Sequence, residues 1–238
     1  MDTIFLITIL VVIFALAFDF INGFHDTANA IATSVSTRAL KPRVAVLMAA
    51  IMNFVGALTF VGVAKAIASN IVDPMSLNAF EGDVTGSVVI LAALCSAITW
   101  NLLTWYYGIP SSSSHTLIGS LAGAAIGAAG FGILNYSGFL SILAALIISP
   151  ILALTAGFIV MSLFKIFFKN LGLYKTNSRF RLVQIATAAV QSFTHGTNDA
   201  QKAMGIITMA LIAAGLQTGD EVQGWVRIAC ATAMGLGT

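Results

Sequence analysis

Long apolar segments recur along the whole chain and are separated by short polar connections. They cover residues 4–36, 44–70, 86–107, 114–134, 139–168, 182–215 and 225 to the end. Most reach the length of about 20 residues that an α-helix needs to cross the hydrocarbon core of a bilayer. Stretches such as 4–18 lack the apolar–polar alternation that marks a membrane β-strand. The pattern therefore predicts an all-α, polytopic membrane protein.

Composition supports this prediction. Of the 238 residues, 58% are hydrophobic and 8% are charged, whereas an ordinary soluble domain has about 25% charged residues. The 11 basic residues are dispersed and the net charge is only +2, so we expect a lipid bilayer and no nucleic acid as partner. Cys95 and Cys230 lie in apolar segments, and no residue spacing builds a closed metal site. We therefore expect no cofactor and no resident metal.

The charged connections predict the orientation of the chain. Two connections collect basic residues: Arg38, Lys41, Arg43, Lys165, Lys169, Lys175, Arg179 and Arg181. Cytoplasmic loops are enriched in such residues, so 169–181 is predicted to be a cytoplasmic loop. The acidic residues fall in connections on the other side: Asp2, Asp73, Glu81, Asp83, Asp220 and Glu221. Together they predict an N-terminus outside the cell membrane.

The connection 109–115 differs from these loops because it contains four serines and no Lys or Arg. Non-helical backbone at membrane depth is tolerated only where protein buries it or where it lines a cavity. We therefore expect residues 86–134 to form a re-entrant helical hairpin with its tip inside the protein.

A short internal similarity suggests a repeat. Residues 23–30 and 196–203 share Gly, Asp and Ala at matching positions, and the predicted topology runs their helices in opposite directions. Inverted repeats of this kind are common in transporters. We expect residues 1–168 to form the first repeat and 182–238 to begin the second. The same offset places a second polar hairpin tip beyond residue 238, so the chain is predicted to be an N-terminal portion.

Polar residues form a stripe on the first helix, at intervals of three and four: Asp19, Asn22, Asp26, Asn29 and Thr33. A carboxylate inside a membrane costs at least about 2.5–3.5 kcal/mol and normally marks an ion or substrate route. We interpret Asp26 as a site residue, with a buried packing seam as the alternative. Asp19 is either a site residue or part of an outer vestibule.

The later helix repeats the spacing with Ser192, His195, Asp199 and Lys202, and Asn198 lies beside this stripe. Lys202 either neutralises Asp199 or helps to hold an anion. All three histidines, including His25 and His115, fall in these polar segments. Each is either a packing residue or a proton carrier.

The serine tip predicts an anion site. Pro110 ends one helix, and a new helix begins near Thr116, so backbone N–H groups and the hydroxyls of Ser111, Ser112, Ser113 and Ser114 converge there. This favours phosphate or sulfate over a simple N-cap. Glycines follow at four-residue intervals, Gly119, Gly123 and Gly127, which predicts close helix packing, with a homodimer contact as the lesser alternative.

An anion and two carboxylates can share a low-dielectric pocket only if cations or protons offset their charge. Loading both partners makes the pocket nearly neutral, which predicts a symporter.

Three segments carry a resemblance to a known family: NGFHDTANA at 22–30, GIPSSSSHT at 108–116 and THGTNDAQKA at 194–203. They resemble the inorganic phosphate transporter (PiT) family, in the same order. The resemblance implies phosphate and cation sites at Asp26, Asn29, Asn198, Asp199 and the four serines. Together with the residue patterns, it gives a phosphate set of Ser111, Ser112, Ser113, Ser114, Thr116, Asn198 and Lys202, and a coupling-ion set of Asn22, His25, Asp26, Asn29, His195 and Asp199.

The HDTAN and NDAQK forms are similar to the bacterial, low-affinity branch of that family. This implies proton symport at the cytoplasmic membrane, with phosphate carried as a neutral divalent metal complex. Sodium coupling and a sulfate permease of the same fold remain alternatives. An intramembrane serine hydrolase and a passive anion channel are remote ones, and we expect no enzymatic activity.

Overall fold

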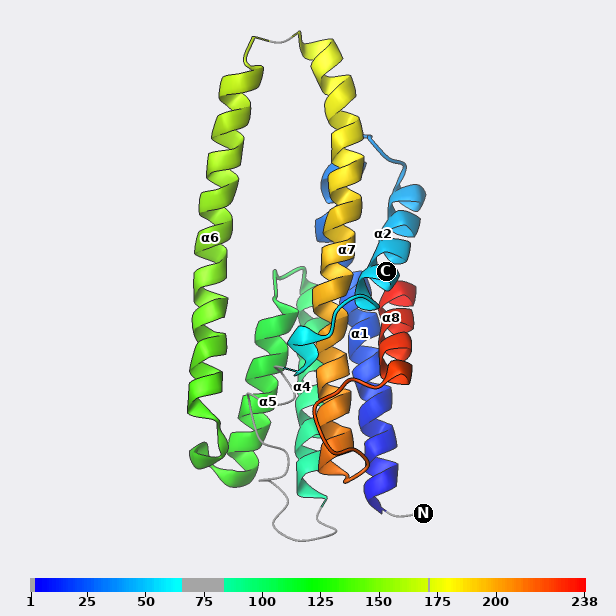
Figure 1. Cartoon of the computed structure of the whole chain (residues 1–238), viewed down its shortest axis with the longest axis vertical. Helices are drawn as coiled ribbons and strands as arrows, with labels where there is room; N and C mark the ends of the chain where they lie inside the picture. Colours follow the sequence, from blue (N-terminus) through cyan, green and yellow to red (C-terminus); the bar gives the residue numbers. More distant parts are fainter. Residues whose placement is uncertain (1–2, 66–83, 171) are drawn as a thin grey trace.

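The computed structural model describes residues 3–65, 84–170 and 172–238 (Figure 1). In these residues the regular elements are helices, which confirms the all-α prediction. They are α1 (Thr3–Ser36), α2 (Pro42–Ala57), α4 (Thr85–Tyr107), α5 (Ser113–Ala129), the short 3-10 helix η2 (Phe131–Ile133), α6 (Tyr136–Phe168), α7 (Leu173–Ala213) and α8 (Gly224–Gly237).

Two boundaries differ from the sequence-based prediction. α2 ends at Ala57 and a turn follows, so 44–70 is not one helix, and its last residues, 66–70, lie outside the described part of the chain. α7 begins at Leu173, so most of the predicted loop 169–181 is helical. The reason is that residues 173–181 contain no Gly or Pro to stop a helix. Apolar periodicity located the membrane part of the helix and missed its polar beginning.

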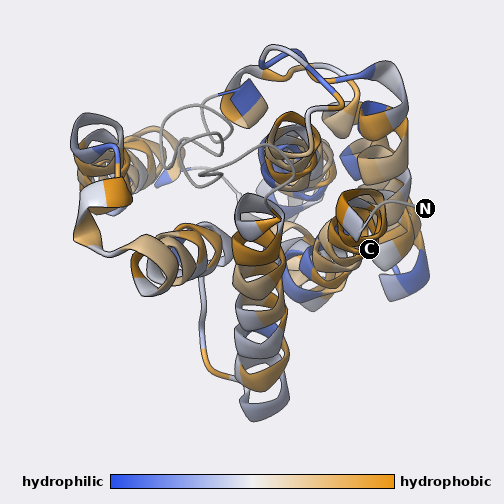
Figure 2. Ribbon diagram, turned by 90° about the horizontal axis from the view of Figure 1, so that it is seen from below, coloured by the Kyte–Doolittle hydropathy of each residue, from blue (hydrophilic) through white to orange (hydrophobic). Residues whose placement is uncertain are grey.

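Hydrophobic residues occur on the outward faces of the helices as well as where the helices meet (Figure 2). On α6, Leu154 is 76% and Phe158 is 73% exposed. Three described helices, α1, α4 and α6, are long and apolar enough to cross a bilayer. An outer surface of this kind is stable only against lipid or another apolar partner, as in a multi-pass membrane protein.

The two polar helices, α1 and α7, pack side by side and run in opposite directions (Figure 1). α2 and α8 pack on this pair, and α4 packs on α1. The lower half of α7 is the most enclosed part of the molecule, since residues 200–211 are buried on nearly every face. In contrast, α6 stands apart and has no buried residue (Figure 1).

Two helix crossings bring backbones into direct contact at glycines. A Cβ added at Gly196 of α7 would lie 2.1 Å from the Asn53 carbonyl oxygen of α2, and one at Gly56 would lie 2.1 Å from the Phe193 oxygen. The crossing of α1 with α8 has the same arrangement. There, a Cβ at Gly23 would lie 2.6 Å from the Met234 oxygen, and one at Gly237 would lie 2.0 Å from the Phe20 oxygen.

These crossings correspond residue by residue. Phe193 and Gly196 follow Phe20 and Gly23 by the same number of positions, and the partner glycines, Gly56 and Gly237, play the same part on α2 and α8. Because α1 and α7 are antiparallel, this correspondence has the form that an inverted repeat requires. The assignment of whole repeats to 1–168 and 182–238 stays a prediction.

α4 and α5 form a helical hairpin whose tip lies at mid-height of α7 and not at the end of the molecule (Figure 1). Gly108 ends α4 in the left-handed conformation, at φ 64°, which costs glycine little. Pro110 follows, and Ser112 caps α5 by accepting a hydrogen bond from the His115 N–H. This is the geometry expected of a re-entrant hairpin.

The glycine spacing on α5 does not produce the predicted close packing. Among the described residues, nothing lies within 4 Å of a Cβ added at Gly119, Gly123 or Gly127. Small residues permit a close approach but do not cause one. A homodimer contact on this face stays a prediction.

Candidate functional site

The hydroxyl of Ser113 joins the hairpin tip to both polar helices. Its Oγ lies 3.1 Å from Asp26 Oδ2 and 3.3 Å from Asp199 Oδ2, and it accepts a 2.8 Å hydrogen bond from Lys202 Nζ. Ser113 is the first residue of α5 and is only 4% exposed. A hydroxyl carries one proton, so it donates to one of the two carboxylates at a time.

Asp199 is held by a lysine, a histidine and an amide. Its Oδ2 lies 2.9 Å from Lys202 Nζ and 3.4 Å from His195 Nε2, and it accepts a 2.8 Å hydrogen bond from Asn22 Nδ2 of α1. Lys202 is three residues and His195 four residues away on α7, so all three side chains lie on one face. None of the described residues is shown bonding Oδ1, which leaves this oxygen for a ligand.

Asp26 has a different set of partners. Its Oδ1 lies 2.9 Å from Nδ1 of the adjacent His25, and its Oδ2 contacts Ser113. No lysine or arginine in the described part of the chain forms an ion pair with it. The charge of Asp26 is therefore compensated only when His25 is protonated or when another cation is present.

Most predicted site residues line one cavity of about 280 Å³ between the hairpin tip, α1 and α7. Its lining includes the predicted residues Asp26, Asn29, Ser111, Ser112, Ser113, Ser114, His195, Asp199 and Lys202. Asn22 and His25 do not line it but contact its two carboxylates. The sequence patterns thus identified residues that the fold brings together from three helices.

Three predicted or candidate residues lie elsewhere. Thr116 and His115 line a neighbouring cavity, and the Thr116 hydroxyl bonds to the Ser112 carbonyl in its own helix. Asn198 is exposed on α7 and does not line the 280 Å³ cavity. A residue one position before Asp199 is turned about 100° around the helix axis, so sequence adjacency does not bring Asn198 to the site.

Two residues of the site were missed. Gln191 lines the cavity, four positions before His195, and extending the stripe backwards would have found it. Asn53 of α2 is fully buried, and its Oδ1 lies 3.1 Å from His195 Nδ1. Its amide also donates to Thr27 and Thr238. The only sequence signal was a single amide side chain in an apolar helix. No other polar residue lies three or four positions from it in that helix, so no stripe marked it as a site residue.

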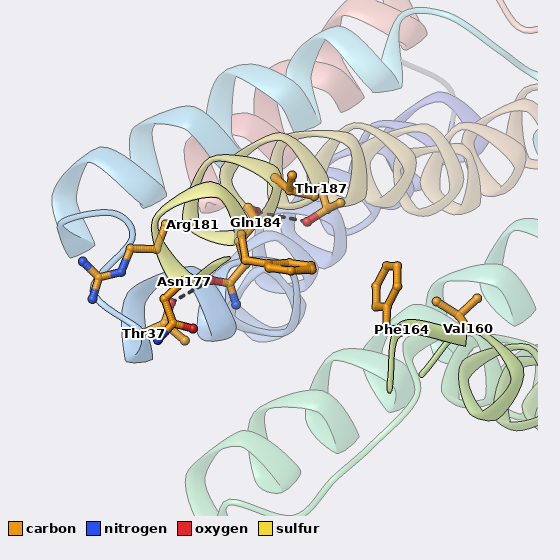
Figure 3. Close-up of a pocket in the computed structure, with 9 residues that line it drawn as sticks. Thr37, Val160, Phe164, Asn177, Arg181, Gln184 and Thr187 are labelled. Carbon is orange, nitrogen blue, oxygen red and sulfur yellow. Dashed lines mark hydrogen bonds between the residues drawn. The ribbon is translucent and has the colours of Figure 1, made fainter. Parts of the chain in front are cut away.

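A larger cavity of about 590 Å³ lies between α6, the beginning of α7 and the end of α1 (Figure 3). Phe164 of α6 and Phe180 of α7 stack edge to face there, with ring centroids 5.9 Å apart. On its polar side, Thr37 donates a 2.8 Å hydrogen bond to Gln184. It holds neither of the two carboxylates, so size alone does not identify the functional site.

The smaller cavity can bind both signs of charge. Lys202 and the serine hydroxyls at the N-terminus of α5 are donors for an oxyanion. Asp26, Asp199 and His195 bring one ligand atom each to within 4.8 Å of one another, close enough to hold a metal ion. A pocket with this composition offers donors to an anion and ligand atoms to a proton or a metal cation.

A polar pocket at mid-height of antiparallel membrane helices, closed by a helical hairpin, is typical of multi-pass transporters. The family model described as "Phosphate transporter family" matches residues 22–238 of this chain. The chain belongs to this family.

Individual relatives agree. A Bacillus subtilis protein described as "Probable low-affinity inorganic phosphate transporter" is 67% identical over all of this chain and 70% of its own length. A Mycobacterium leprae relative with the same description is 44% identical, over 97% of this chain and 54% of its own length. The Escherichia coli "Low-affinity inorganic phosphate transporter PitA" is 38% identical, over 87% of this chain and 46% of its own length. The chain thus spans about half the length of several relatives.

A solved structure titled "The sodium-dependent phosphate transporter" has the same fold. Its TM-score is 0.79 at 22% sequence identity, over 97% of this chain and 74% of that chain. At this identity the match supports the fold and not the coupling ion. The relatives are named as transporters, so the chain belongs to a family of transporters and not of enzymes.

Proposed function

We propose that the protein imports inorganic phosphate across the cytoplasmic membrane by proton symport. The observation that carries this proposal is Ser113, whose hydroxyl lies within hydrogen-bond distance of two carboxylates and one lysine. The family and the names of the relatives support phosphate as the substrate.

Phosphate binds, in this proposal, at the N-terminus of α5. Lys202 supplies a positive charge, and Ser111 to Ser114 supply hydroxyl and backbone donors. Phosphate would approach two carboxylates in a site largely shielded from water, which is unfavourable unless cations enter with it. Coupling is therefore a consequence of the charges in the pocket.

The direct test is uptake of radiolabelled phosphate by proteoliposomes that contain the full-length protein. We expect accumulation when the inside is alkaline relative to the outside, with no requirement for sodium. Accumulation that needs a sodium gradient and ignores a pH gradient would replace the proton with sodium. Excess sulfate in the same assay separates the two oxyanions, and we expect weak competition.

The substrate species is proposed to be a neutral complex of phosphate with a divalent metal. The ligand atoms of Asp26, His195 and Asp199 support this, because they lie within reach of one cation. The prediction is that uptake falls when divalent metals are chelated and that labelled metal enters with phosphate. Undiminished uptake in a chelator would leave free phosphate as the substrate.

Two other classes of activity lack support. A passive channel gives no role to the paired acids, and its conduction would not need a cation gradient. A serine hydrolase needs a base held by a third group. His115 Nδ1 does lie 2.8 Å from Ser112 Oγ, but no acidic side chain is shown bonding this imidazole in the described residues. The pair is explained by the capping of α5.

The proposed orientation has the N-terminus outside. The basic connection after α1 and the α6–α7 connection lie toward one end of the molecule, and the N-terminus lies at the other (Figure 1). Arg38 and Lys169 belong to the former connections, and the α7–α8 connection, which contains Asp220, lies on the half nearer to the N-terminus (Figure 1). This separation supports a cytoplasmic basic end. Labelling of single cysteines placed at each end in intact cells tests it.

A further inference from the structure

A third carboxylate, outside the phosphate cavity, is buried without a counter-charge. Asp19 of α1 is 0% exposed, and neither of its oxygens has a hydrogen-bond partner that meets ordinary distance criteria in the described residues. The Cys230 thiol of α8, a weak donor, is the side chain that interacts with it as a hydrogen-bonding group. A buried polar atom without a partner calls for a specific explanation.

The other two acids have side-chain partners. Asp199 has Lys202 and His195, and Asp26 has His25 and Ser113. Asp19 interacts electrostatically with both Asp199 and Lys202 of α7, but neither of its oxygens hydrogen-bonds to Lys202. α4, which also packs on α1, has no charged side chain, and the one charged residue of α2, Arg43, lies in its first turn. The one charged residue of α8, Arg227, donates a hydrogen bond to the Leu58 carbonyl and not to Asp19.

The repeat shows that Asp19 is the exception. At the equivalent position of α7 stands Ser192, which is also fully buried but donates a 2.9 Å hydrogen bond to the Ala188 carbonyl of its own helix. The serine is thus satisfied locally, whereas the aspartate is not. An unneutralised carboxylate costs several kcal/mol or more in a dry interior, and a neutral carboxyl costs far less.

We propose that Asp19 binds the transported proton, at a site separate from the phosphate cavity. This inference rests on the proposed proton symport. In the closed arrangement described here, Asp19 is protonated. When the pocket opens to water on the cytoplasmic side, hydration stabilises the carboxylate and the proton leaves to solvent. Protonation from the outer side then restores the neutral form.

The charge of Asp19 reaches the phosphate cavity through one helical turn. Asn22 lies three residues after Asp19 on the same face of α1 and donates to Asp199. An ionised Asp19 adds negative charge behind Asp199 and opposes the arrival of an anion. A proton on Asp19 removes this repulsion, and by linkage bound phosphate favours the proton equally. Proton and phosphate therefore load together.

The experiment compares Asp19→Asn, Asp19→Glu and Ser192→Ala with the wild type in proteoliposomes. One assay measures accumulation driven by a pH gradient, and the other measures exchange of labelled for unlabelled phosphate at equal pH. We expect Asp19→Asn to lose accumulation and keep exchange, with exchange no longer dependent on pH. Asp19→Glu keeps a titratable group and should restore accumulation. Ser192→Ala, the matched control, should retain both activities.

Several outcomes would overturn the assignment. If the Asp19→Asn variant accumulates phosphate like the wild type, Asp19 has no role in coupling. If size-exclusion chromatography shows that the Asp19→Asn variant is folded but the variant also loses exchange, Asp19 takes part in phosphate binding. Failure of Asp19→Glu to restore accumulation, with exchange intact, excludes titration at this position. If the wild type itself ignores the pH gradient, the proposed function fails, and this result is distinguishable from the other three.

Discussion

Asp26 and Asp199 occupy equivalent positions of the two crossed helices, yet their surroundings differ. Asp199 has a lysine, a histidine and an amide around one oxygen, whereas Asp26 has only its neighbouring histidine and Ser113. The half of the pocket around Asp199 therefore carries its own positive charge, from Lys202. The charge of Asp26 in the other half is compensated only by a protonated His25 or by a cation that enters the pocket. In the proposed function, similar backbones thus provide an anion-binding side and a cation-binding side.

The largest effect is expected from Asp199→Asn. It leaves the Lys202 ammonium, which is 5% exposed, without its ion-pair partner. Breaking such a pair from one side costs about 3–5 kcal/mol, so both uptake and thermal stability in detergent should fall. The double variant with Lys202→Met should recover stability but not uptake. A single variant as stable as the wild type would contradict the importance of this pair.

Asp26→Asn should abolish coupled uptake with a smaller loss of stability. No lysine is left unpaired, and the hydrogen bonds lost to the charged group are worth about 1.5–3 kcal/mol. Phosphate uptake and unfolding temperature in detergent check the two effects, and Asp220→Asn, away from the cavity, is the control. Flux that persists without any gradient dependence would instead favour a channel.

The two crossings are compared by Gly196→Ala and Gly23→Ala. Each added methyl meets backbone atoms, at 2.1 Å and 2.6 Å respectively, and overpacking of this kind costs about 1–3 kcal/mol. We expect both variants to unfold at lower temperature, with the larger loss for Gly196→Ala. Gly123→Ala on α5 is the control, since nothing described lies within 4 Å of its Cβ. Equal stability of all three would argue against the crossings.

The smallest effect is expected from Asn198→Ala. Asn198 and His25 are equivalent in the repeat, but only His25 contacts an acid of the cavity. An exposed substitution of this kind changes stability by less than about 0.5 kcal/mol, and uptake should remain near the wild-type level. His25→Gln, in the same uptake assay, should reduce it. A strong loss with Asn198→Ala would return this residue to the phosphate site.

The membrane makes part of this site readable from sequence. Polar residues are so costly among apolar segments that the stripes carrying Asp26 and Asp199 had to face a cavity, and the serine-rich connection had to be protected. Periodicity gave no access to Asn53, because its role depends on how α2 crosses α7. Nor could it separate glycines that form a crossing, such as Gly196, from exposed ones, such as Gly123. Both distinctions arise only from tertiary packing.

Ser113 gives the cavity an internal competitor for its ligand. The Lys202 ammonium donates a hydrogen bond to the Ser113 hydroxyl, so in the proposed function an arriving oxyanion displaces a bond that already exists. This exchange lowers the affinity for the oxyanion. It also favours release, because Ser113 and Lys202 form their hydrogen bond again as the oxyanion leaves. A transporter must release its substrate as well as bind it. In the proposed function, a serine at the tip of the hairpin limits the residence time of the bound oxyanion.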